Sequence, residues 1–162
     1  VLNNLMAAAL TTGEVLILSD GTPWRPIVHV EDFSLAFRAA LEAPREIVHD
    51  QAFNVGRTTE NYRVSDLAEI VASVVPGSRI EYAEGGGPDP RNYRVDCSKL
   101  EATLTAYRPR WTALDGARQL YAKYQEHGMT AERFEGPCFF RIRRIQDLQA
   151  RGRLGDDLRW LH

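Results

Sequence analysis

The sequence predicts an α/β fold, in which helices alternate along the chain with short strands. Apolar residues recur at helical spacing in several segments, and short runs of β-branched or other apolar residues stand between these segments. Glycine and proline separate most of the predicted elements. With 162 residues and 44% hydrophobic content, the chain is long enough for a domain with its own core.

The chain opens with a predicted helix whose apolar stripe ends before Gly13, where glycine favours a helix end. A strand is expected next, over residues 15–18. Asp20, Gly21 and Pro23 are then typical of a turn. The helical stripe consists of Leu2, Leu5, Met6, Ala9 and Leu10.

The next segment combines a short strand and a helix. The β-branched residues Ile27, Val28 and Val30 favour a strand. Pro44 ends the following helix, and residues 51–55 are expected to form another strand, bounded by Gly56. The buried stripe of the helix is predicted to consist of Phe33, Ala36, Phe37, Ala40 and Leu41.

In the second half, a helix is predicted from near Ser65 to residue 75 and a strand over residues 79–83. Residues 85–90 hold three glycines and two prolines and therefore indicate a loop. Two further helices are expected after capping boxes, and a final short helix lies around residues 145–149. The capping boxes pair Ser98 with Glu101 and Thr112 with Asp115.

Arg25 lies between the turn and the strand predicted after it, on the side where the chain enters that strand. A guanidinium is a planar fork that binds two oxygens of a phosphate at once. The segment can therefore hold a positive charge beside a bound anion. The simpler alternative is a surface arginine packed against Trp24.

Four segments resemble, in order and spacing, the extended short-chain dehydrogenases, the family of nucleotide-sugar epimerases and dehydratases. Pro26 stands where many members have aspartate. The resemblance implies that the chain is the substrate-binding C-terminal portion of a Rossmann-type enzyme, with the strand at 52–56 belonging to the cofactor-domain sheet. The four segments are Asn3–Met6, Asp20–Asp32, Ala52–Gly56 and Asp89–Lys99.

The same resemblance implies that Arg25 and Arg91 contact the diphosphate of a UDP- or dTDP-linked sugar. Asn4 is expected to hydrogen-bond the pyrophosphate or the base, unless it is a helix cap or a solvated side chain. Asp89 and Tyr93 are expected to accept from ribose hydroxyls or to pack on the nucleoside; the alternatives are a turn-forming aspartate and a tyrosine at the edge of the core. Residues 16–18 lie where the family lines the base pocket, although three apolar strand residues also suit a core.

Two sequence features of the family's chemistry are missing. No tyrosine has a lysine four residues later, and no glycine fingerprint follows a strand and opens a helix. The resemblance therefore implies that the NAD or NADP site and the catalytic Tyr/Lys pair lie in a missing N-terminal half. Alone, the chain is expected to bind no cofactor and to be inactive. Val1 lies within a predicted helix, which is typical of a fragment.

Composition excludes several other classes of protein. The net charge of −2 and the pI near 6.1 argue against a nucleic-acid binder. No apolar run approaches the roughly 18 residues that span a membrane, and no signal peptide is recognisable, so a cytoplasmic protein is expected. Cysteines and histidines are scattered, which indicates neither a metal motif nor a disulfide framework.

We divide the chain into a substrate-binding α/β domain over residues 1–128 and a docked C-terminal tail over residues 129–162. The tail interleaves Arg141, Arg143 and Arg144 with apolar residues, but acidic residues surround them, which favours docking over nucleic-acid binding.

The sequence thus predicts the nucleotide-sugar binding portion of an NAD(P)-dependent epimerase or dehydratase. The alternative is a non-catalytic module of the same family that binds a ligand or a partner protein. Because the isolated chain is expected to expose an unpaired strand edge and apolar helix faces, we expect it to associate with the missing half or with itself as a homo-oligomer.

Overall fold

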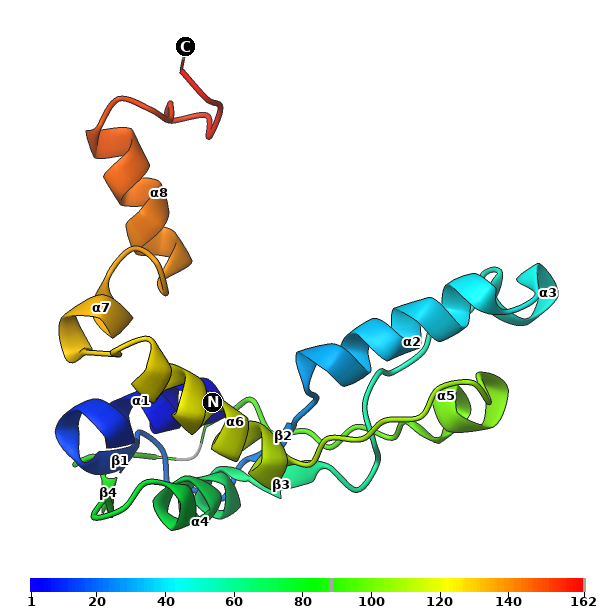
Figure 1. Ribbon diagram of the computed structural model, residues 1–162, viewed down its shortest axis with the longest axis horizontal. Coiled ribbons are helices and arrows are strands. Elements are labelled where there is room, and N and C mark those ends of the chain that lie inside the picture. The colour runs from blue at the N-terminus through cyan, green and yellow to red at the C-terminus, as the bar shows by residue number, and fades with distance from the viewer. Residues whose placement is uncertain (88, 162) are drawn as a thin grey trace.

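A computed structural model describes residues 1–87 and 89–161 of the chain. Pro88, within the predicted loop, and His162, the last residue of the predicted tail, lie outside the described residues. Figure 1 shows the elements, which are α1 (Leu2–Thr12), β1 (Glu14–Ile17), β2 (Trp24–Pro26), α2 (Val30–Glu42), α3 (Arg45–Val48), β3 (Asn61–Arg63), α4 (Val64–Val74), β4 (Arg79–Tyr82), α5 (Ser98–Thr103), α6 (Ala113–Glu126), α7 (Ala131–Glu135) and α8 (Arg141–Ala150).

The largest core lies where α1, α4 and α6 pack together beside β1. We call these three helices, with β1 and β4, the body. The two strands are parallel, with Glu14 opposite Arg79 and Ile17 opposite Tyr82. Alternation along β1 buries Val15 and Ile17 on one side. Gly13 ends α1 at φ 77°, a left-handed conformation that glycine adopts without strain, and the predicted helix end is confirmed.

A second sheet joins β2 and β3 in antiparallel register, with Arg25 opposite Tyr62. Helices α2, α3 and α5 form what we call the arm, which projects away from the body in Figure 1. Its small core includes Ala36, Ala39 and Leu100. Helix α7 packs against α1, whereas α8 extends beyond it (Figure 1). The predicted α/β class is confirmed, with short strands and longer helices.

The strand predicted over residues 27–30 is wrong. The strand lies earlier, as β2, so Arg25 is within it instead of at its entry. Ile27 continues the pairing by donating its backbone N–H to the Glu60 carbonyl at 2.9 Å. His29 then caps the next helix, because its Nδ1 accepts the Glu31 backbone N–H at 3.2 Å. Val30 therefore begins α2 despite its β-branched side chain.

The stripe predicted for α2 is only partly buried. Ala36 is buried as expected, but Phe33 is 41%, Phe37 59% and Leu41 85% exposed. The small arm core packs on the alanine side of the helix, so the face carrying the two phenylalanines and Leu41 is bare among the described residues. Helical spacing correctly identified an apolar face of α2. The core of the arm, however, buries the neighbouring face, which carries the alanines.

The strand predicted over residues 51–55 is not formed among the described residues. A strand is defined by backbone bonds to a neighbouring strand. Here, side chains hold the segment instead. Lys99 Nζ donates to the Ala52 carbonyl at 3.0 Å, and Asn54 Nδ2 donates to the Asp96 carbonyl at 2.9 Å.

Of the two predicted capping boxes, the one at Thr112 and Asp115 is confirmed, with reciprocal bonds of 3.2 and 3.3 Å. The box at Ser98 and Glu101 is wrong, because α5 begins at Ser98 itself. The carboxylate of Asp96 accepts the Ser98 backbone N–H at 2.9 Å and takes the capping role.

Candidate anion-binding site

The site begins with the turn that leads into β2. The Asp20 carboxylate accepts from the backbone N–H and the hydroxyl of Thr22, at 3.0 and 2.7 Å, which closes the turn. Gly21 has φ 81° in this turn. In β2, alternation turns Arg25 inward while Trp24 and Pro26 are half-buried.

Arg25 is a buried arginine, with 9% of its surface exposed. Its Nη1 donates to the Trp24 carbonyl at 2.7 Å and also to the Arg91 carbonyl. Its Nη2 donates to Asp89 Oδ2 at 2.7 Å. A buried guanidinium with a carboxylate partner is a built feature of the fold rather than a solvated surface charge.

Asp89 is shared by two arginines. Arg91 donates to its carboxylate from the backbone N at 2.9 Å, from Nε at 3.0 Å and from Nη2 at 2.9 Å. These bonds from Arg91, with a smaller contribution from the charge of Arg25, lower the pKa of Asp89 to about 2. The carboxylate is therefore ionised at neutral pH.

A cavity of about 620 Å³ lies beside these groups. The predicted residues Asn4, Arg25, Asp89 and Arg91 all line it. Asn4 comes from the first turn of α1, Arg25 from β2, and the other two from the loop after β4. The structure thus brings together, at one cavity, four of the five residues singled out in the sequence.

Tyr93, the fifth predicted residue, does not line this cavity. Its ring lies 5.8 Å from the guanidinium carbon of Arg25, and it is 53% exposed. Arg94 points elsewhere, with its guanidinium carbon 4.5 Å from the centre of the Trp24 ring. Tyr93 therefore packs beside the buried arginine from outside.

The apolar wall of the cavity contains residues that the sequence left undecided. Alternation buries Val15 and Ile17 in the core and leaves Leu16 and Leu18 40% and 74% exposed. Both leucines line the cavity. An apolar wall facing two arginines suits a ligand with a flat or apolar part and an anionic part. Residues 15–18 are all apolar, so the family resemblance, and no alternation in the sequence, pointed to this wall.

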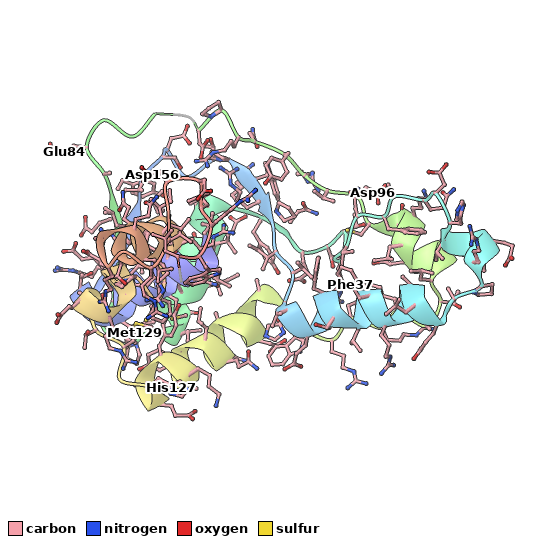
Figure 2. The ribbon with its side chains drawn as sticks, turned by 90° about the horizontal axis from the view of Figure 1, so that it is seen from above. Phe37, Glu84, Asp96, His127, Met129 and Asp156 are labelled. Atoms are coloured by element: carbon pink, nitrogen blue, oxygen red, sulfur yellow. The ribbon has the colours of Figure 1, made fainter. Side chains whose placement is uncertain are left out.

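Side-chain amides fasten the segment after Arg91 to the two-stranded sheet. Asn92 Oδ1 accepts the Trp24 backbone N–H at 3.0 Å. Asn61 donates to the Val95 carbonyl at 2.9 Å and accepts the Val95 N–H at 2.8 Å. In Figure 2 this segment leads to Asp96, which lies beside the arm. These contacts fix the position of the segment that follows Arg91 relative to β2 and β3.

A second cavity, of about 560 Å³, lies between the start of α1 and α6. His29 stacks on Trp111 with ring centres 3.9 Å apart, and its Nε2 is 2.7 Å from Gln119 Oε1. Because Nδ1 already accepts a backbone N–H, the proton of the neutral ring belongs on Nε2. Of the two ring nitrogens, Nδ1 thus caps α2 and Nε2 ties His29 to α6.

Within residues 1–87 and 89–161, no three His, Cys, Asp or Glu side chains gather as a metal site requires. No helix in the same part of the chain combines the length and the apolar character needed to cross a lipid bilayer.

Residues 1–56 match the family model described as the NAD dependent epimerase/dehydratase family. Three solved structures share the fold. UDP-glucuronic acid 4-epimerase from Bacillus cereus, in complex with UDP-glucuronic acid and NAD, has a TM-score of 0.65 at 20% identity, over 78% of this chain and 40% of that one. dTDP-glucose 4,6-dehydratase from Bacillus anthracis, in complex with NAD, has a TM-score of 0.59 at 19% identity, over 78% and 39%.

L-threonine dehydrogenase from Clostridium difficile has a TM-score of 0.64 at 16% identity, over 78% of this chain and 40% of that one. The chain therefore spans about two fifths of the length of the structures that it matches. These likenesses confirm the predicted α/β fold, which the chain shares with part of each of these enzymes. Because an amino-acid dehydrogenase shares this fold, the substrate must be argued from the site.

Proposed function

We propose that this chain, whose residues 1–56 match the model of the NAD dependent epimerase/dehydratase family, is the nucleotide-sugar binding portion of an NAD(P)-dependent epimerase or dehydratase. The observation that carries the proposal is the cavity where Arg25 and Arg91 meet the apolar wall of Leu16 and Leu18. The arginines would hold the diphosphate of a UDP- or dTDP-linked sugar, and the wall would pack on its base.

Each remaining site residue has a role in this proposal. Asn4 donates to the pyrophosphate or the base from the start of α1. Asp89 and Tyr93 lie next to the arginines, where Asp89 can accept from a ribose hydroxyl and Tyr93 can pack on the nucleoside. Binding energy from this non-reacting part of the substrate positions the sugar for reaction.

The catalytic Tyr/Lys pair and the NAD or NADP site belong, in this proposal, to a cofactor domain outside the sequence. Two surfaces of this chain could pack against such a cofactor domain. The exposed face of α2 offers Phe33, Phe37 and Leu41, and the extended segment 51–55 leaves backbone groups free of a strand ladder among the described residues. NAD would accept and return a hydride, while this chain's residues hold the substrate in place. The cytoplasmic location stays a prediction.

The first test is binding of UDP and dTDP to the chain, measured by isothermal titration calorimetry. Arg25→Ala should weaken binding about tenfold, which corresponds to ~1.4 kcal/mol. Arg63→Ala is a matched control, because Arg63 belongs to the same sheet and carries the same charge but stacks on Trp24 outside the cavity. Equal affinities of the wild type and Arg25→Ala would contradict the assignment of Arg25.

The alternative, a non-catalytic module, differs in what accompanies the chain. A glycine-rich turn between a strand and a helix, followed by a tyrosine and lysine four apart, is expected upstream of Val1 if the chain belongs to an enzyme. An unrelated upstream domain would favour the module. The two proposals share the ligand site and differ in the chemistry that follows binding.

A further inference from the structure

The Asp89 carboxylate has both oxygens engaged by arginine. Oδ1 accepts from the backbone N and Nε of Arg91, at 2.9 and 3.0 Å, and Oδ2 accepts from Nη2 of Arg25 and Nη2 of Arg91, at 2.7 and 2.9 Å. This is the way in which two guanidiniums hold one phosphoryl group, with short charge-assisted bonds. The donors that a diphosphate requires are thus already in use.

The charges indicate what happens when a ligand arrives. Two guanidiniums carry two positive charges, and Asp89 neutralises one of them. A diphosphate with two negative charges is matched by the two arginines alone, but it is repelled by a carboxylate that remains between them. The ligand gains most when the carboxylate leaves.

We propose that Asp89 is an internal competitor for the anion site, which holds Arg25 and Arg91 together in the free chain and is displaced by the diphosphate. The proposal rests on the proposed function, because it concerns the same site. It makes Asp89 a residue that tunes affinity: the arginines keep their places while the ligand is absent, and the loss of their bonds to Asp89 is subtracted from the binding energy.

The chain around Asp89 is suited to such a displacement. On the upstream side, Gly85 has φ 74°, and a Cβ added at either Gly85 or Gly87 would meet nothing within 4 Å. Glycine in open space leaves the backbone free to rotate. On the downstream side, Asn92 is fastened to Trp24 and Val95 to Asn61. Gly86 itself packs on the Leu18 carbonyl, so Gly87, beyond it, is the point about which the carboxylate can swing while the following segment stays in place.

The low pKa of Asp89 is consistent with this role. Hydrogen bonds from Arg91 lower it to about 2, so the carboxylate stays charged at every pH at which the protein is expected to work. Competition is then a constant property of the site and requires no protonation step.

The test uses inorganic pyrophosphate, which has no ribose or base, so that any contact of Asp89 with a nucleoside does not enter. Calorimetric titration of the 162-residue chain should show that Asp89→Asn binds pyrophosphate about tenfold more tightly than the wild type. Glu84→Gln is the matched control. It removes one negative charge from an exposed position of the same loop, and its affinity should change much less.

An affinity of Asp89→Asn equal to or weaker than that of the wild type would overturn the proposal, because Asp89 would then position the arginines instead of competing for them. Asp89→Ala, measured in parallel with a circular dichroism check, supplies the answer if the amide variant misfolds. If UDP binding depends on Arg25 but pyrophosphate binding is unchanged in Asp89→Asn, the proposed function stands and this inference fails. Absence of binding in every variant overturns both.

Discussion

The Asp32 carboxylate accepts a hydrogen bond from the backbone N–H of Trp111, with 3.0 Å between Oδ2 and N. Its other oxygen accepts the Arg110 backbone N–H at 2.9 Å. Asp32 is in the first turn of α2 and is only 2% exposed. It therefore joins the arm to the segment that leads into α6.

Replacement of Asp32 by asparagine should destabilise the chain by about 2 kcal/mol. The amide keeps one acceptor but turns a donor toward a backbone N–H, and hydrogen bonds to charged groups contribute about 1.5–3 kcal/mol. Urea unfolding followed by circular dichroism measures the loss. Glu31→Gln is the control, because Glu31 is exposed and bonds only the Trp111 ring Nε1, at 3.0 Å. An equal loss in both variants would contradict the assignment.

Tyr62 should make stability depend on alkaline pH. Burial first, and then its bond to Glu60 Oε2 at 2.8 Å, raise the pKa of Tyr62 to about 12. An unfolded tyrosine has a pKa of about 10. The stabilisation is therefore fully present below pH ~10 and is lost as the pH rises through about 12.

The measurement compares the unfolding free energies of the wild type and Tyr62→Phe at several pH values. The difference between them should be constant below pH ~10 and should shrink between pH ~10 and ~12. Tyr107, whose pKa burial also raises to about 12, is present in both proteins and cancels. A difference that stays constant over the whole range would show that the pKa of Tyr62 is not raised in the folded state.

The exposed face of α2 should cause self-association of the isolated chain. Phe37, which Figure 2 labels on α2, and Leu41 present apolar surface that water does not favour. Light scattering at micromolar concentration should give a mass above that of a monomer, and Phe37→Ser with Leu41→Ser should lower it. Ile142→Ser on α8 is the comparison, since Ile142 is also exposed. A monomeric wild type, or dissociation by Ile142→Ser alone, would count against α2.

Much of the body could be predicted from the sequence, because its helices have one clear apolar stripe and its glycines mark their ends. The β2–β3 pair could not, since strands of three residues are too short to show a period. The stripe predicted for α2, of which only part is buried, has another cause. Which apolar face is buried depends on the partner that covers it, and the arm core of small alanines selects one face locally.

The candidate site, too, has features that the sequence indicated and features that it did not. Arg25 and Arg91 were identified from their segments, and both line one cavity. The bond between Arg25 and Asp89 spans 64 positions and depends on how the loop after β4 folds back, which no local pattern contains. Leu16 and Leu18 could not be distinguished from core residues, because residues 15–18 form an unbroken apolar run.

The apolar wall and the buried arginine belong to different sheets. Leu16 is in the parallel pair β1–β4, Arg25 is in the antiparallel pair β2–β3, and the two sheets share no strand among the described residues. The two sheets are nevertheless joined, because Tyr62 packs against the core of the body and β3 leads directly into α4. A nucleotide held by both would add to these contacts and would stabilise the chain by about 2.7 kcal/mol at a hundredfold excess over Kd. Ligand binding and cooperative unfolding would then be linked, since only the folded chain brings both sheets to the ligand.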